Sequence, residues 1–114
     1  MTVKELQKIL KAEIVGAPLH EEREIHTACG SDMMSDVLAF VKDQSVLITG
    51  LNNPQVVRTA DMMDMICIVF VRGKRPDFAM INMAQERDIV MMTTPLRMYS
   101  ACGRLYTAGL QGKE

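Results

Sequence analysis

The side chains that could do chemistry gather in short polar segments after apolar runs. Lys74 and Arg75 stand in one such segment, and Asn53-Pro54 and Thr94-Pro95 mark two others. A cap residue followed by proline is typical of a helix start, where backbone N–H groups and the positive dipole end can bind an anion. With two cations nearby, a phosphate or carboxylate could be held there, although the same residues could simply cap helices. The predicted ligand-binding residues are Asn52, Asn53, Lys74, Arg75, Thr93 and Thr94.

A second group of residues carries side chains of the metal-ligand type. His20, Glu21, Glu22, His26 and Cys29 place imidazole, carboxylate and thiol groups within ten residues. Such groups could together bind zinc or iron. Their spacing matches no HExxH, CxxC or EF-hand pattern, which favours a solvated charged loop. We therefore predict no metal and no cofactor.

No catalytic set is predicted from the remaining residues. Asp32 and Asp36 lie four residues apart, a spacing that an acid–base pair could use, but helix capping and surface charge explain them more simply. Cys29, beside a predicted helix start, is the thiol with a route to activation. Cys67 falls within an apolar strand and Cys102 on an apolar helix face. An enzyme using Cys29 or the two aspartates is the least favoured of three function classes, and we predict a protein that is not an enzyme.

Composition narrows the class of protein further. With 114 residues the chain is expected to form one domain with one site. A formal net charge of −1 and the absence of Trp argue against nucleic-acid binding. Three cysteines without a CxxC pair argue against a disulfide framework. No leader is recognised and no apolar run approaches the roughly 20 residues of a membrane span, so we expect a cytoplasmic protein without membrane contact.

Three strand–turn–helix units position the polar segments. Apolar runs at 45–49, 65–71 and 89–93 each precede a polar loop and a proline-opened helix. Runs buried on both faces are typical of parallel strands, and the helices are the crossovers that parallel pairing requires. Parallel strands would place all three helix N-termini at one edge of the sheet. The predicted fold is α/β, with a small parallel or mixed sheet and helices on both faces.

The remaining elements are predicted from local signals. A capping box at Thr2 starts a helix that ends near Lys11, and short strands are expected at 12–15 and 25–28. Ser31 is expected to cap a second helix with Asp32 in its first turn, and 42–44 to form a turn. Gly103 within the closing helix costs roughly 1 kcal/mol relative to Ala, which predicts close packing against the same chain or a second copy.

Three stretches of the sequence resemble the small stand-alone DRTGG-domain proteins. They are SDMMSDVL at 31–38, VLIT at 46–49 and GRLYTAGL at 103–110, and the likeness covers a single domain over 1–114. That family is similar in fold to the N-terminal domain of HPr kinase/phosphorylase. The resemblance implies a non-catalytic regulatory or ligand-sensing module that tends to dimerise. It implies no kinase activity, since the chain has no GxxxxGK[ST] pattern.

Two loops differ from the residues that name the family. Where relatives have Gly-Asp-Arg, this chain has Gly50-Leu51-Asn52, and where they have Thr-Gly-Gly, it has Val71-Arg72-Gly73 ahead of Pro76. The predicted function is a homodimeric regulatory or sensory module whose strand-end loops bind a small anionic ligand or a partner protein. The alternative is a structural interaction domain whose Met-bearing helices dock on a larger enzyme or signalling protein.

Overall fold

The computed structural model describes residues 1–16, 20–40 and 44–112. The strands within these ranges form one sheet in the order β1-β5-β4-β3-β2. β2 to β5 run parallel, and β1 pairs with β5 in the antiparallel direction. The predicted parallel or mixed sheet is therefore confirmed as a mixed one. Its strands are β1 (Glu13–Val15), β2 (Thr27–Gly30), β3 (Ser45–Thr49), β4 (Cys67–Phe70) and β5 (Val90–Thr93).

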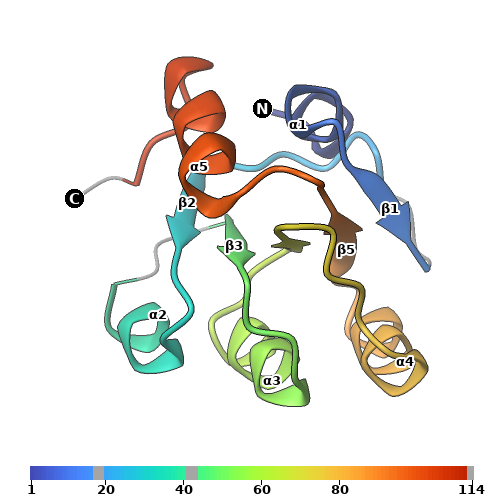
Figure 1. Ribbon diagram of the computed structural model, residues 1–114. Helices are drawn as coiled ribbons and strands as arrows, with labels where there is room; N and C mark the ends of the chain where they lie inside the picture. The colour runs from blue at the N-terminus through green and yellow to red at the C-terminus, as the bar shows by residue number, and fades with distance from the viewer. Residues whose placement is uncertain (17–19, 41–43, 113–114) are drawn as a thin grey trace.

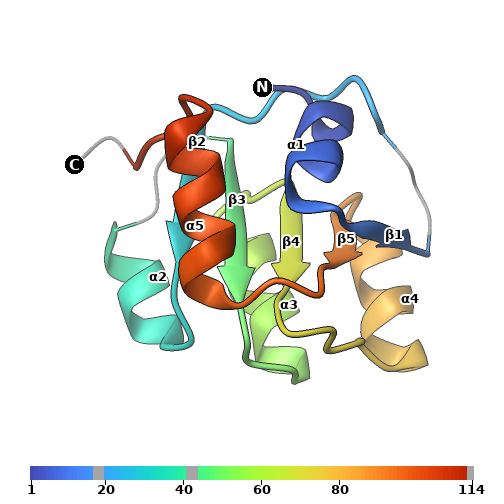
Figure 2. The ribbon, with the colours of Figure 1, turned by 45° about the horizontal axis from the view of Figure 1, so that its top comes forward.

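Helices cover both faces of the sheet, as predicted. On one face lie α1 (Val3–Leu10) and α5 (Met98–Thr107) (Figure 1). The other face carries α2 (Met34–Phe40), α3 (Pro54–Met62) and α4 (Phe78–Glu86). Figure 2 shows β3 and β4 pointing the same way, so the helices that follow them begin at one edge of the sheet. Among the helices described, none is long and apolar enough to cross a membrane.

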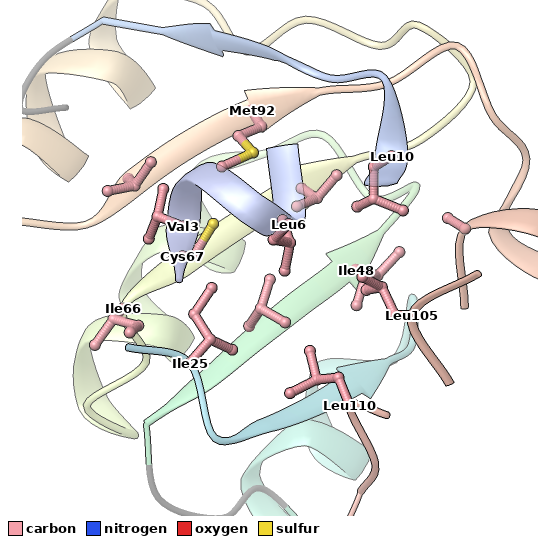
Figure 3. Close-up of a cluster of buried hydrophobic side chains, with 14 of the residues drawn as sticks. Val3, Leu6, Leu10, Ile25, Ile48, Ile66, Cys67, Met92, Leu105 and Leu110 are labelled. Atoms are coloured by element: carbon pink, nitrogen blue, oxygen red, sulfur yellow. The ribbon is translucent and has the colours of Figure 1, made fainter. Parts of the chain in front are cut away.

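The sheet separates two apolar clusters. Side chains alternate along each strand, so Ile48 and Met92 face α1 and α5 (Figure 3), whereas Leu47 and Met91 pack toward α2 to α4. Every residue of β3, β4 and β5 is buried. This two-sided burial explains why the three runs are almost continuously apolar in sequence.

The first helix begins and ends where the sequence predicts. The Thr2 hydroxyl accepts a hydrogen bond from the Glu5 N–H (3.1 Å), and the Glu5 carboxylate accepts one from the Thr2 N–H (3.0 Å). The hydrogen bonds from Thr2 hold the pKa of Glu5 below its ordinary value. Lys11 ends the helix in the left-handed conformation, with φ 52°. The capping-box prediction is confirmed.

The predicted start of the closing helix is wrong. α5 begins at Met98 with Arg97 at the N-cap, so Pro95 lies before the helix and not at its first position. The reason lies in a distant partner of Thr94, whose buried hydroxyl donates to the Leu10 carbonyl oxygen (2.6 Å). This bond holds the residue after β5 against the end of α1. Thr94 therefore does not cap a helix, and α5 begins three residues after Pro95.

The other two proline-opened helices differ from each other. α3 begins at Pro54, with Asn53 accepting from the Gln55 N–H (2.9 Å), as predicted. α4 begins after Asp77, whose side chain accepts from the Met80 N–H, so Pro76 precedes the cap. Asp77 is a favourable N-cap because its carboxylate accepts a backbone N–H and complements the positive end of the helix dipole.

The second helix also begins later than predicted. The Ser31 hydroxyl accepts from the Met33 N–H (3.0 Å) and α2 starts at Met34, which leaves Asp36 in place of Asp32 in the first turn. Ser31 therefore closes a local turn before the helix. Of the turn predicted at 42–44, residues 42 and 43 lie outside the described residues.

Close packing at Gly103 is wrong within the described chain. A Cβ atom added there would meet nothing within 4 Å, because Gly103 lies on the exposed side of α5. The close approach is at Gly30, where a Cβ atom would lie 2.6 Å from Cys102 Sγ. Contact of Gly103 with a second copy stays a prediction.

Candidate functional site

Four loops meet at the carboxyl edge of the parallel strands. We call them the strand-end rim, and they comprise residues 31–33, 50–53, 71–77 and 94–97, which follow β2, β3, β4 and β5. Because β2, β3, β4 and β5 are neighbours in the sheet and run parallel, their loops lie side by side. The crevice outside the carboxyl ends of parallel strands is the usual ligand site of such folds.

Lys74 connects the loops that follow β3, β4 and β5. Its Nζ donates to the Gly50 carbonyl oxygen (2.6 Å), and its own carbonyl accepts from Thr93 Oγ1 (2.7 Å). The neighbouring Gly73 N–H donates to the Thr94 carbonyl (2.8 Å). Among the described residues Lys74 forms no ion pair. Its positive charge is thus bonded to a neutral group.

Asn52 and Arg75 are also joined through the backbone. Asn52 Nδ2 donates to the Arg75 carbonyl (2.9 Å), and the Arg75 guanidinium pairs with the Glu13 carboxylate of β1 (2.7 Å). The hydrogen bond between these two side chains lowers the pKa of Glu13 and raises that of Arg75. Because the pair is exposed, it contributes little to stability. The Arg75 charge is therefore already neutralised.

The last two predicted residues are used by the fold. Asn53 caps α3 through its side-chain oxygen. Thr94 is fully buried and reaches α1, as described above, while its Oγ1 also accepts from the Leu96 N–H (3.2 Å). The structure thus places five of the six predicted residues in the rim and Thr93 directly before it, at the end of β5, but it bonds the Thr94 side chain to the end of α1.

Sequence reasoning missed two side chains at the rim. Asp32 Oδ1 accepts from the Gly50 N–H (2.6 Å) and from Thr49 Oγ1 (3.2 Å), which ties the end of β3 to the loop after β2. A Cβ atom on Gly50 would lie 3.2 Å from Arg72 Nη2 and 3.4 Å from Asp32 Oδ1, so both side chains flank this glycine. The Arg72 side chain forms no hydrogen bond or ion pair with the described residues. The sequence could have indicated Asp32, because it follows the predicted strand at 25–28 and parallel strands end at the same edge of a sheet.

The thiols are poorly suited to nucleophilic chemistry. Burial raises the pKa of Cys29, with Cys102 and Asp36 adding to the effect, and burial also raises the pKa of Cys102. Full burial raises the pKa of Cys67 to about 12. A catalytic cysteine needs the opposite shift, because the thiolate is the nucleophile. Activation of Cys29 is therefore opposed by its surroundings.

The residues of the metal-ligand type lie partly around one hollow, which His20, Glu21 and Glu22 line together with Asp88. His20 Nε2 lies 3.6 Å from the Asp88 carboxylate in an exposed pair. Within residues 1–16, 20–40 and 44–112, no three His, Cys, Asp or Glu side chains are placed to hold a metal ion.

Comparison with known families decides which domain this is. The DRTGG domain matches residues 5–108, nearly the whole chain. The chain belongs to the DRTGG domain family. Membership of the DRTGG family confirms the resemblance seen in the sequence. No curated protein matches the sequence.

A solved DRTGG structure has the same fold. It comprises the CBS and DRTGG domains of the regulatory region of Clostridium perfringens pyrophosphatase, complexed with its activator diadenosine tetraphosphate. The TM-score is 0.76 at 18% sequence identity, over 91% of this chain and 45% of that chain. This chain therefore spans less than half the length of the solved regulatory region. The match confirms the α/β fold and places a DRTGG domain within a regulatory protein.

Proposed function

We propose that this DRTGG domain is a non-catalytic, homodimeric regulatory module of the cytoplasm that binds a small anionic ligand at the strand-end rim. Support comes from the family and from the role of the matched structure as a regulatory region bound to a polyphosphate activator. The raised pKa values of the thiols support the non-catalytic part of the proposal.

The observation that carries the ligand proposal is the position of Lys74 among three loops. A lysine ammonium has three donors, and the Gly50 carbonyl uses one of them. Lys74 can therefore keep this bond and still donate to an anion, while Arg72 beside Gly50 offers a second cation. The Asp32 carboxylate opposes anion binding at the rim, because it repels a negative charge. Lys74 and Arg72 must therefore outweigh this repulsion. Arg72 Nη2 and Asp32 Oδ1 both lie close to where a Gly50 Cβ atom would stand, so an anion held by Arg72 would also lie near Asp32.

Ligand binding can be tested by thermal unfolding and calorimetry. The probes are diadenosine tetraphosphate, ATP, inorganic phosphate and succinate, which separate nucleotide, phosphate and carboxylate chemistry. A ligand that binds only the folded state stabilises it by about 2.7 kcal/mol at 100 times its Kd, so Tm should rise with concentration. Lys74→Met keeps the apolar stem of the side chain and should weaken binding at least about tenfold.

The matched control for this experiment is Lys8→Met. Lys8 is exposed on α1 and is not a rim residue, and its replacement should leave affinity unchanged. The proposal fails if none of the four probes raises Tm, or if Lys74→Met binds the active probe as tightly as the parent chain does.

A domain that only docks on a partner protein is the second candidate. Large apolar side chains are exposed on or beside the α2–α4 layer: Met33 is 60% exposed, Met62 70% and Phe78 77%. Light scattering after size exclusion tests the homodimer, whose interface should bury roughly 1,000 Å² or more. A monomer at all concentrations would remove the dimer and favour docking on another protein.

A further inference from the structure

Helices α1 and α5 carry an excess of basic side chains. The layer of α1 and α5, with their cap residues, carries one acidic residue, Glu5, against several basic ones. The opposite layer is nearer to balance, because Arg87 pairs with both Asp61 and Glu86. Beside the start of α1, the segment 21–24 adds the carboxylates of Glu21 and Glu24, so the basic excess belongs to the two helices themselves. The basic residues of the α1–α5 layer are Lys4, Lys8, Lys11, Arg97 and Arg104.

An open groove of about 510 Å³ runs between the end of α1 and the outer side of α5. We call it the α1–α5 groove. Tyr99, Gly103 and Thr107 follow one another at four-residue spacing and so form one row along α5. Its other lining residues include Ile9, Ser100 and Arg104.

Gly103 makes the groove suitable for a helix. A Cβ atom there would touch no described atom within 4 Å, so this part of α5 has a depression that residues 1–16, 20–40 and 44–112 leave unfilled. Helices pack by placing the side-chain ridge of one into such a depression of the other. Tyr99, which is 91% exposed beside the depression, is an aromatic residue of the kind that anchors protein interfaces.

We propose that the α1–α5 groove binds an acidic amphipathic helix of a partner protein, with its apolar stripe over Gly103. Charge complementarity selects this occupant, because Arg104 is the one charged residue among the described residues that line the groove. Arg104 Nη1 donates to the Ile9 carbonyl (3.4 Å), which leaves further guanidinium donors for a carboxylate. A second copy docked symmetrically would present the same lining residues, and none of those described carries a carboxylate for Arg104.

The proposal is tested with two synthetic peptides of about 16 residues, long enough to approach the marginal length for an isolated helix. Both have leucines at i, i+3, i+4 and i+7 spacing; one carries glutamates elsewhere and the other lysines. Fluorescence anisotropy with the full chain should show the acidic peptide binding at least about tenfold more tightly than the basic one. The preference should decrease as salt is added.

Two substitutions separate groove binding from folding. Gly103→Gln places a side chain in the depression, and its Cβ would meet no described atom within 4 Å, so it should weaken the acidic peptide at least about tenfold while Tm does not fall. Tyr99→Ala should weaken it by a similar factor. The matched control is Tyr106→Ala, since Tyr106 is an exposed α5 tyrosine (63%) that does not line the groove, and this variant should bind like the parent chain.

Three results would overturn the proposal. Equal affinity for the two peptides would remove charge complementarity, and unchanged binding by Gly103→Gln would remove the groove. Self-association that Gly103→Gln abolishes would show a second copy in place of a partner helix. The inference does not rest on the rim, because Lys74→Met should bind the acidic peptide like the parent chain, so failure of one proposal leaves the other standing.

Discussion

Single polar side chains complete the backbone hydrogen bonding where the strands end. Asp32 accepts the Gly50 N–H, Lys74 donates to the Gly50 carbonyl, and Thr94 donates to the Leu10 carbonyl. Backbone groups removed from water need such partners, and loops outside the sheet cannot supply them by regular pairing. At this scale, the rim is built by side chains that connect one loop to another.

Replacement of Thr94 tests the buried connection to α1. Thr94→Val keeps the shape of the side chain but leaves the Leu10 carbonyl without its donor, so the free energy of unfolding should fall by about 1–3 kcal/mol. Urea denaturation measures the change. Thr94→Ser keeps the hydroxyl and should lose less; an equal loss in both variants would mean that the methyl group matters more than the hydrogen bond.

Cys67 predicts a loss of stability at alkaline pH. Its pKa is raised to about 12 in the folded chain from an ordinary value near 9.0, so unfolding allows the thiol to ionise at lower pH. The stability linked to this group is complete below about pH 9 and is lost as pH rises toward 12, with a slope of up to roughly 1.4 kcal/mol per pH unit.

The measurement compares the parent chain with Cys67→Ala in urea between about pH 8 and pH 10.5, a range that spans the ordinary thiol pKa. The difference between their unfolding free energies should shrink above about pH 9, because only the parent chain carries this thiol. A difference that stays constant across the range would contradict the burial of Cys67.

At the scale of the elements, two glycines predict opposite effects of alanine. Gly103→Ala should raise the free energy of unfolding by roughly 1 kcal/mol, since a helix interior favours Ala and the added Cβ meets nothing. Gly30→Ala should lower it, because the new Cβ would lie 2.6 Å from Cys102 Sγ. Urea denaturation of both variants and of Gly30→Ala with Cys102→Ala measures these effects. If the double variant regains no stability, the strain does not come from the thiol.

The elements themselves were predictable where one local signal decided them. The continuous apolar runs predicted β3 to β5, and the capping-box sequence of Thr2 and Glu5 predicted α1. The start of α5 was not predictable, because the partner of Thr94 lies 84 residues away. The prediction of close packing at Gly103 was wrong for a similar reason. The unfavourable helix propensity of glycine is known from the sequence, whereas the side of the helix on which Gly103 lies depends on how α5 packs.

The candidate site was predictable as a place and less so as a set of side chains. Parallel strands required the loops after β3, β4 and β5 to meet at one edge, and Lys74 and Asn52 do join them. The roles of Asp32 and Arg72 depend on β2 lying beside β3 and on which side chain reaches Gly50. Such choices among partners are made by the assembled fold.

For the whole molecule, the basic excess of α1 and α5 predicts unusual chromatographic behaviour. At pH 7 and low salt the chain should be retained on a cation exchanger despite its formal charge of −1, because α1 and α5 carry several basic side chains. Retention should be lost by roughly 0.15 M salt, where the Debye length is about 8 Å. Replacing both Lys4 and Lys8 with Gln should abolish it, whereas Arg58→Gln on α3 should not. Parent chain in the flow-through would contradict this prediction.

Residues 94–97 are the part of the rim that leads into α5, and they bond both to another rim loop and to the end of α1. The Thr94 and Leu96 carbonyls accept from the Gly73 and Arg72 N–H groups of the rim, while the Thr94 hydroxyl bonds to the end of α1 and Arg97 caps α5. An occupant of either site that shifted this segment would change the affinity of the other site, and thermodynamic reciprocity requires equal factors in both directions. The concentration of a rim ligand would then control how tightly the α1–α5 groove binds its partner helix.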